Sequence, residues 1–174
     1  LMLFTHDYSF KGAHAEKVKA LVGHKFDKEH TLFERNMDVY LMAPVVGFLY
    51  SRKAELDKSK PSTTNILAEI MIKYQKELTF TYRLVMLLDK EYEPDTEKRI
   101  NKAFRDYAKE DTKDLEEYDS YVRGGVDVLY EKLMKDATQA DDYIRNLYEF
   151  MADFEDRYSQ NSDEIMDLCK LARE

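Results

Sequence analysis

The chain has 174 residues and carries 27 Lys and Arg against 35 Asp and Glu, a formal net charge of −8. Its content of 44% hydrophobic and 36% charged residues excludes a disordered polar tract and a protein built of membrane spans. The longest uncharged run, residues 39–50, is shorter than the roughly 20 residues that a bilayer-crossing helix needs.

The first elements are an extended arm and two helices. Residues 1–10 are expected to form the arm or a short strand, because their apolar residues alternate irregularly, and an amphipathic helix is expected over 13–26. Thr31 and Glu34 have the spacing of a capping box and predict a helix from Thr31 to Tyr50. Pro44 lies inside it and removes a backbone donor, so we expect a kink or a break into two short helices.

A linker and a long helix follow. Residues 55–62 are charged, contain Pro61 and predict a linker. Apolar residues then recur every three or four positions and predict one helix over 63–89. Residues 90–95 form a second expected linker, in which Asp95 is placed as the next N-cap.

The remaining chain predicts four helices. A short one includes residues 100–107, and a longer one spans residues 115–133. Gly124 and Gly125 lie in its middle, where each costs about 1 kcal/mol against Ala, so either a neighbouring backbone packs there or the helix bends. The last two helices are expected over 144–158 and after a cap at Asn161.

Histidines and the cysteine are the first candidates for chemistry. His24 with Asp27 and His30 with Glu34 are the local pairs that a metal would use, but the two histidines are six residues apart and point about 120° away from each other on a helix. We therefore expect no metal and no cofactor, and name no catalytic residue. Cys169 has no partner for an internal disulfide and is expected on the inward face of the last helix, where burial would make it inert.

Charge is unevenly distributed. Residues 1–109 have a net charge of +3 and residues 110–174 a net charge of −11. A basic stripe recurs at helical spacing and would contact nucleic-acid phosphates; it consists of Lys98, Lys102, Arg105 and Lys109, with Arg99 beside it. The alternative, which we favour, is a solvated face that pairs with the acidic run 110–119.

Tyrosines are abundant, 13 in all with no tryptophan. Most lie at core spacing, but four lie beside the main apolar stripes and are candidates for a partner surface: Tyr121, Tyr130, Tyr143 and Tyr148.

Residues 38–52, DVYLMAPVVGFLYSR, form an apolar helix ending in Ala-x-x-x-Gly-Phe with an arginine shortly after. This segment resembles one in small helical accessory proteins of bacterial DNA-phosphorothioation and phage-defence islands. The resemblance covers 15 of 174 residues and implies a bacterial genomic setting; it transfers no catalytic residue.

Together these patterns predict one all-α domain, residues 1–174, with six or seven helices and the N-terminal arm. We expect an acidic cytoplasmic protein, because the start lacks a signal-peptide pattern, and one that does not enter the membrane. The expected function is a non-enzymatic adaptor that binds a protein partner or itself. The alternatives are a nucleic-acid-associated accessory factor of a DNA-modification or defence system and a metal-dependent enzyme.

Overall fold

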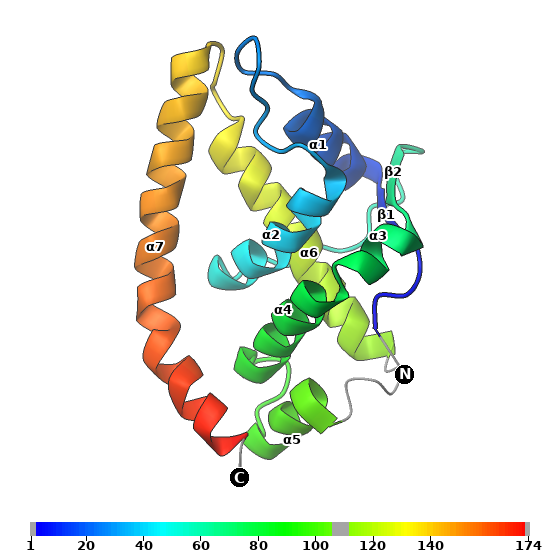
Figure 1. The fold of residues 1–174 in the computed structure, drawn as a ribbon, viewed down its shortest axis with the longest axis vertical. Helices are drawn as coiled ribbons and strands as arrows, with labels where there is room; N and C mark the ends of the chain where they lie inside the picture. Colours follow the sequence, from blue (N-terminus) through cyan, green and yellow to red (C-terminus); the bar gives the residue numbers. More distant parts are fainter. Residues whose placement is uncertain (1–2, 106–111, 173–174) are drawn as a thin grey trace.

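The computed structural model (Figure 1) describes residues 3–105 and 112–172, with only the backbone described for Thr112, residues 158–162 and Glu164. These residues form seven α-helices, a short π-helix and a two-stranded sheet. The predicted all-α class and the expected number of helices are confirmed.

The sheet joins the N-terminal arm to the start of the predicted long helix. Strand β1 (Tyr8–Lys11) pairs antiparallel with β2 (Thr63–Ile66), with Tyr8 opposite Ile66. The prediction of helix from residue 63 is therefore wrong for its first turn. Helix α3 (Ala68–Lys73) begins only after the strand, and the Asp7 carboxylate accepts a hydrogen bond from the Ala68 N–H (2.7 Å), so its cap comes from the distant arm.

The rest of the predicted helix is divided. Helix α3 ends at Lys73, and α4 (Gln75–Leu88) begins two residues later; Tyr74 lies between them with φ and ψ of −100° and 15°, which are not helical. The Arg35 guanidinium donates to the Tyr74 hydroxyl (3.0 Å) and lies 5.5 Å from the centroid of its ring. A tertiary contact therefore accompanies a change of direction that no glycine or proline marks.

Helix α1 (Gly12–Gly23) matches its prediction closely, whereas α2 (Asn36–Leu49) begins later than expected. Thr31 does not cap it, because Thr31 forms an isolated β-bridge with Lys25. Asp38 instead accepts the Arg35 N–H (3.0 Å) at the true start of the helix. The helix runs without a break through Pro44, so the alternative of two short helices is wrong.

Helix α2 and the segment that follows it pack across the long α6 (Thr112–Leu133) at three glycines. A Cβ on Gly125 would lie 1.7 Å from the Ala43 carbonyl oxygen, and one on Gly47 would lie 2.1 Å from the Tyr121 carbonyl oxygen. A Cβ on Gly124 would lie 1.9 Å from the carbonyl oxygen of Arg52. Of the two explanations for the glycine pair, close packing of neighbouring backbone is the correct one.

The third quarter of the chain contains the short helices. Helix α5 (Thr96–Ile100) is capped as predicted, because the Asp95 side chain accepts the Lys98 N–H (2.9 Å), and it continues into the π-helix η1 (Asn101–Arg105).

The last helix, α7 (Ala140–Leu171), is continuous where two helices were expected. The backbone is helical through Asn161, so the predicted cap at that position is wrong. At the true start, Asp142 accepts the N–H groups of Thr138 (3.0 Å) and Gln139 (3.2 Å). Cys169 is partly exposed rather than fully inward.

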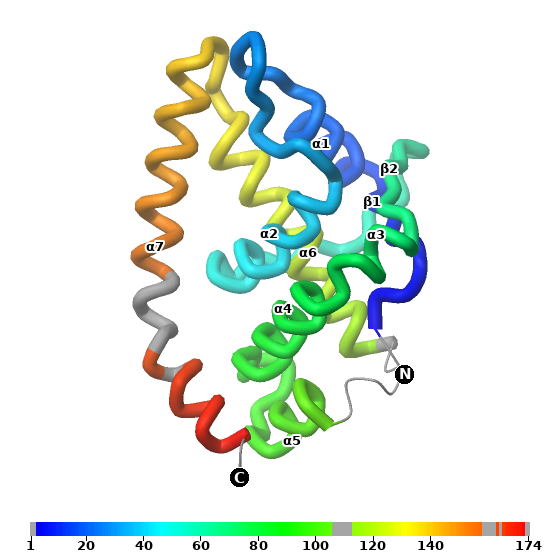
Figure 2. Tube along the Cα trace, in the orientation of Figure 1, coloured from blue at the N-terminus to red at the C-terminus, as the bar shows by residue number. Residues whose placement is uncertain are grey.

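The buried side chains form one hydrophobic cluster that draws on β1, β2 and the helices around α6. Its largest fully buried members are Tyr40, Tyr82, Tyr118, Phe10 and Leu21. Figure 2 shows α7 along one long edge of the molecule, with the C-terminal end of α2 directed toward its middle. This arrangement leaves α7 in contact with the core along only part of its circumference.

Candidate interaction surface

Tyr50, the residue after α2, makes several contacts with α7. The Tyr50 ring stacks on Phe150, with 6.3 Å between centroids and 18° between planes, and the Arg157 guanidinium lies 3.9 Å from the Tyr50 centroid. The Tyr50 hydroxyl donates to Asp153. Burial and this hydrogen bond raise the pKa of Tyr50 to about 12, and the same bond lowers the pKa of Asp153. These contacts fix which side of α7 faces the core.

A second apolar stripe of α7 remains exposed. Its members lie at i, i+3, i+4 and i+7, the spacing that puts side chains on one helical face. They are Ile144, Leu147, Tyr148 and Met151, which are exposed by 54%, 37%, 76% and 61%. Phe150 of the core-facing side is only 6% exposed. The apolar arc of α7 is thus wider than the part that the fold covers.

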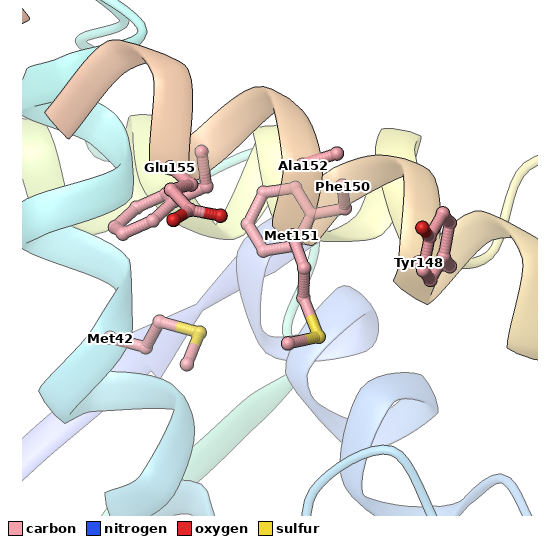
Figure 3. A pocket seen from close by; sticks show the side chains of 7 residues that line it. Met42, Tyr148, Phe150, Met151, Ala152 and Glu155 are labelled. Carbon is pink, nitrogen blue, oxygen red and sulfur yellow. The ribbon is translucent and has the colours of Figure 1, made fainter. Parts of the chain in front are cut away.

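The stripe borders a cavity between α7 and α2. The cavity has a volume of about 440 Å³ and is lined by Met42 of α2 and by six residues of α7: Tyr148, Phe150, Met151, Ala152, Phe154 and Glu155. Figure 3 shows the side chains of Met42 and Met151 extending into the space between the two helices from opposite sides. We call Met42, Ile144, Leu147, Tyr148 and Met151 together the α2–α7 face.

Apolar surface continues from this face across α2 toward α4. Leu41, next to Met42, and Val45, one turn later, are both partly exposed. Leu41 and Phe80 of α4 line a further cavity of about 480 Å³, and Phe80 is 69% exposed. An exposed apolar area that extends over several elements is typical of a binding surface, unlike single scattered apolar residues.

The outer edge of the face is acidic. Helix α7 contains nine acidic and three basic residues, a net charge of −6. Glu155 lines the cavity itself, and Glu149 is exposed on the same helix. The three basic residues pair with acids of the same helix: Arg145 with Asp142 (3.0 Å), Arg157 with Asp153 (3.5 Å) and Lys170 with Asp167 (3.0 Å). The negative charge of α7 is therefore not balanced by its own bases.

The four tyrosines proposed for a partner surface are placed differently from one another. Tyr121 and Tyr143 are 4% and 6% exposed, so both rings are buried and neither presents a surface to a partner. Tyr130 is partly exposed, with the Lys17 ammonium 5.8 Å from its ring centroid. Tyr148 alone of the four is widely exposed and belongs to the α2–α7 face.

Two residues of the basic stripe, Arg99 and Lys102, make contacts within the protein. Arg99 is 3% exposed and donates to the carbonyl oxygens of Leu87, Glu93 and Pro94, each at 2.9 Å. It is a structural residue, because burial removes it from any phosphate.

The other members of the stripe differ in exposure. Lys102 pairs with Asp114 at 2.7 Å. Asp114 belongs to the acidic run 110–119, so this ion pair is of the kind that the favoured alternative describes. Lys98 and Arg105 are exposed, and Arg105 donates to Asn101 (2.7 Å). Lys109 lies outside the described residues.

The weak metal candidates do not gather into one site. Asp27 accepts the N–H groups of Glu29 (2.8 Å) and His30 (2.7 Å) and lies 2.7 Å from the His30 ring nitrogen, which shapes the loop between α1 and α2. His24 instead packs on the Tyr143 ring, with 4.9 Å between centroids. Within residues 3–105 and 112–172, no three His, Cys, Asp or Glu side chains are placed to hold a metal ion. Glu34, the fourth candidate ligand, therefore belongs to no such group.

A polar cavity of about 410 Å³ lies beside the end of α4. Its buried carboxylate, Asp89, accepts hydrogen bonds from the Tyr121 hydroxyl (2.8 Å) and the Tyr92 N–H (3.0 Å), and the Lys53 ammonium lies 3.6 Å away. Burial raises the pKa of Tyr121, and its hydrogen bond to Asp89 raises the pKa further. The carboxylate is thus already engaged in joining α4, α6 and the segment after α2.

Another inward carboxylate belongs to α6. Asp119 faces the Tyr40 hydroxyl at 3.5 Å, and its burial raises its pKa to about 7. Arg123 opposes this rise and Glu116 adds to it. Burial therefore makes Asp119 hold its proton to a higher pH than an ordinary carboxyl group does.

Sequence reasoning found one member of the α2–α7 face, Tyr148, but did not find the other four, because the apolar period of residues 144–158 predicts a helix without showing which apolar residues remain exposed. One signal in the sequence could have indicated the face: apolar residues cover more than one side of this helix. Tyr143 and Phe150 lie on one side and the exposed stripe lies on another.

Comparison of the chain with models of protein families, with curated proteins and with solved structures finds no match. The search for membrane spans, restricted to the described residues, finds no helix with the length and apolar character to cross a bilayer.

Proposed function

We propose that this protein is a helical adaptor that binds a protein partner through the α2–α7 face. The observation that carries the proposal is the second apolar stripe of α7, four exposed side chains at i, i+3, i+4 and i+7 beside a cavity. This is the spacing by which a helix presents anchors to another helix or to a groove.

The chemistry of the face supports a protein ligand. Tyrosine and methionine are enriched in protein interfaces, because an aromatic ring buries a large area at a low entropy cost and the flexible thioether fits irregular shapes. The face combines Tyr148 with the two methionines Met42 and Met151. Covering them would remove apolar area from water at roughly 25 cal/mol per Å².

A matched pair of methionines permits a sharp test. Met151 and Met166 lie on the same helix and are both 61% exposed, but only Met151 lines the cavity. We expect a partner to copurify quantitatively, from cells of the source organism, with the wild-type chain and with Met166→Ser, and to be lost with Met151→Ser. Retention with Met151→Ser, or equal loss with both variants, would contradict the proposal.

The nucleic-acid-associated role takes second place. It depends on Lys98 and Arg105, the exposed members of the basic stripe within the described residues. The burial of Arg99 and the ion pair of Lys102 reduce the positive surface that such a role needs. The resemblance of residues 38–52 adds no argument for either role, because that segment supplies α2, which is used in packing on α6.

A further inference from the structure

We propose that the occupant of the α2–α7 face is an amphipathic helix whose apolar stripe is flanked by lysine or arginine. This inference rests on the proposed function and specifies the chemistry of the partner. It follows from the shape of the face together with its charge.

The shape suits a helix. The exposed stripe extends over eight residues of α7, from Ile144 to Met151, about 10 Å along the axis, which corresponds to two helical turns. Met42 stands across the cavity from Met151, so the face is bounded by α2 on one side and α7 on the other. A helix that lies in such a space contacts it through side chains three, four and seven residues apart.

The charge selects a basic helix. A helix docked on the stripe would bring its flanks beside α7, whose net charge is −6 and whose bases pair with acids of the same helix. Glu155 lies in the lining of the cavity and is exposed. Lysine or arginine on the flank of the docked helix would meet this carboxylate at the rim, where complementary charges raise association rates and specificity.

The other elements beside the face do not reverse this charge. The one acidic residue of α2, Asp38, pairs with Arg35 at 2.7 Å. On the side of α4, Lys76 and Glu77 line the neighbouring cavity together and offset each other.

Charge also argues against two other occupants. A second copy docked symmetrically would place one acidic α7 against another, and an anionic membrane surface would meet the same acidic edge. Both arrangements place like charges together, whereas a basic helix does not.

A pair of synthetic peptides tests the inference directly. Each has roughly 18 residues with leucine at helical spacing; one carries lysine and the other glutamate at every polar position. We expect the lysine peptide to bind the full chain at least tenfold more tightly by fluorescence anisotropy at about 50 mM salt, with the preference shrinking at about 500 mM. Met151→Ser should weaken its binding about fivefold or more, and Met166→Ser should leave it unchanged.

Charge reversal provides the second variant. The substitution Glu155→Lys replaces the exposed carboxylate of the cavity lining and is expected to remove most of the preference for the lysine peptide while the folded chain persists by circular dichroism. A preference that survives this reversal would overturn the inference.

The remaining outcomes separate the inference from the proposed function. Equal binding of both peptides, lost with Met151→Ser, would overturn the basic partner and retain the face. A dimer detected by light scattering and lost with Met151→Ser would also overturn the inference, because the occupant of the face would then be a second copy of this chain. Failure of both peptides to bind, or equal sensitivity of the two methionine variants, would contradict the proposed face as well.

Discussion

Gly125 of α6 lies against the carbonyl oxygen of Ala43 in α2, so closely that a Cβ on the glycine would lie 1.7 Å from that oxygen. The contact joins the backbones of the two helices that cross at the centre of the molecule. Because α2 also carries Met42, the same crossing positions one side of the α2–α7 face.

Gly125→Ala should therefore destabilise the fold strongly. The added methyl group meets backbone rather than a flexible side chain, and we expect a loss of about 3 kcal/mol or more in the free energy of unfolding, measured by urea denaturation. Gly23→Ala is the matched control, because nothing lies within 4 Å of a Cβ there. Equal stability of the two variants would show that the helices do not cross as closely as described.

The buried guanidinium of Arg99 should contribute to stability and to no ligand. Arg99→Lys removes the planar fork that serves three carbonyl oxygens, and we expect a loss of about 2–4 kcal/mol in the free energy of unfolding. Arg105→Lys, at an exposed position, should change it by less than about 0.5 kcal/mol. Thermal unfolding of both variants measures this difference, and a neutral Arg99→Lys would contradict the structural role.

Asp119 should make stability depend on pH. Its pKa rises from 3.8 to about 7 on folding, so between these values the folded chain retains a proton that the unfolded chain releases. The stabilising contribution is complete below the unfolded pKa and is lost as the pH rises through 7. We expect up to about 3 kcal/mol less stability at pH 8 than at pH 5 from this group.

The control for this pH dependence is a pair of amide substitutions. Asp119→Asn should remove that part of the slope in denaturation curves recorded at the two pH values, whereas Asp163→Asn, at an exposed position of α7, should leave it. An unchanged slope in Asp119→Asn would refute the assignment.

A short DNA duplex tests the nucleic-acid alternative. At about 150 mM salt we expect no shift of the chain in size-exclusion chromatography with light scattering, because only Lys98 and Arg105 of the described stripe are exposed. A salt-sensitive complex that Lys98→Glu with Arg105→Glu abolishes would instead favour that role over the adaptor.

Local patterns predicted the helical class and several boundaries correctly. The N-cap at Asp95 depends only on neighbouring residues, so the sequence shows it directly. For the glycine pair of α6 the sequence left two alternatives, backbone packing or a bend, and the structure supports the packing. The strand at 63–66 and the change of direction at Tyr74 were missed because their causes are tertiary. They depend on pairing with β1 and on contacts from Asp7 and Arg35.

Apart from Tyr148, the candidate face was missed for a related reason. Periodicity identifies apolar positions of a helix but not which of two adjacent stripes the fold covers. In α7 the fold buries Tyr143 and Phe150 and leaves Tyr148 and Met151 exposed. Only the tertiary position of α7, fixed at Tyr50, separates the two stripes.

Methyl NMR locates the binding surface most directly. In a chain with methyl-labelled methionine, the lysine peptide should shift the signals of Met42 and Met151, which lie across the cavity from each other. The signals of exposed Met166 and of buried Met71 and Met86 should stay in place. Shifts of Met166 without those of Met42 and Met151, or no shift at saturating peptide, would contradict the assignment of the α2–α7 face as the docking surface.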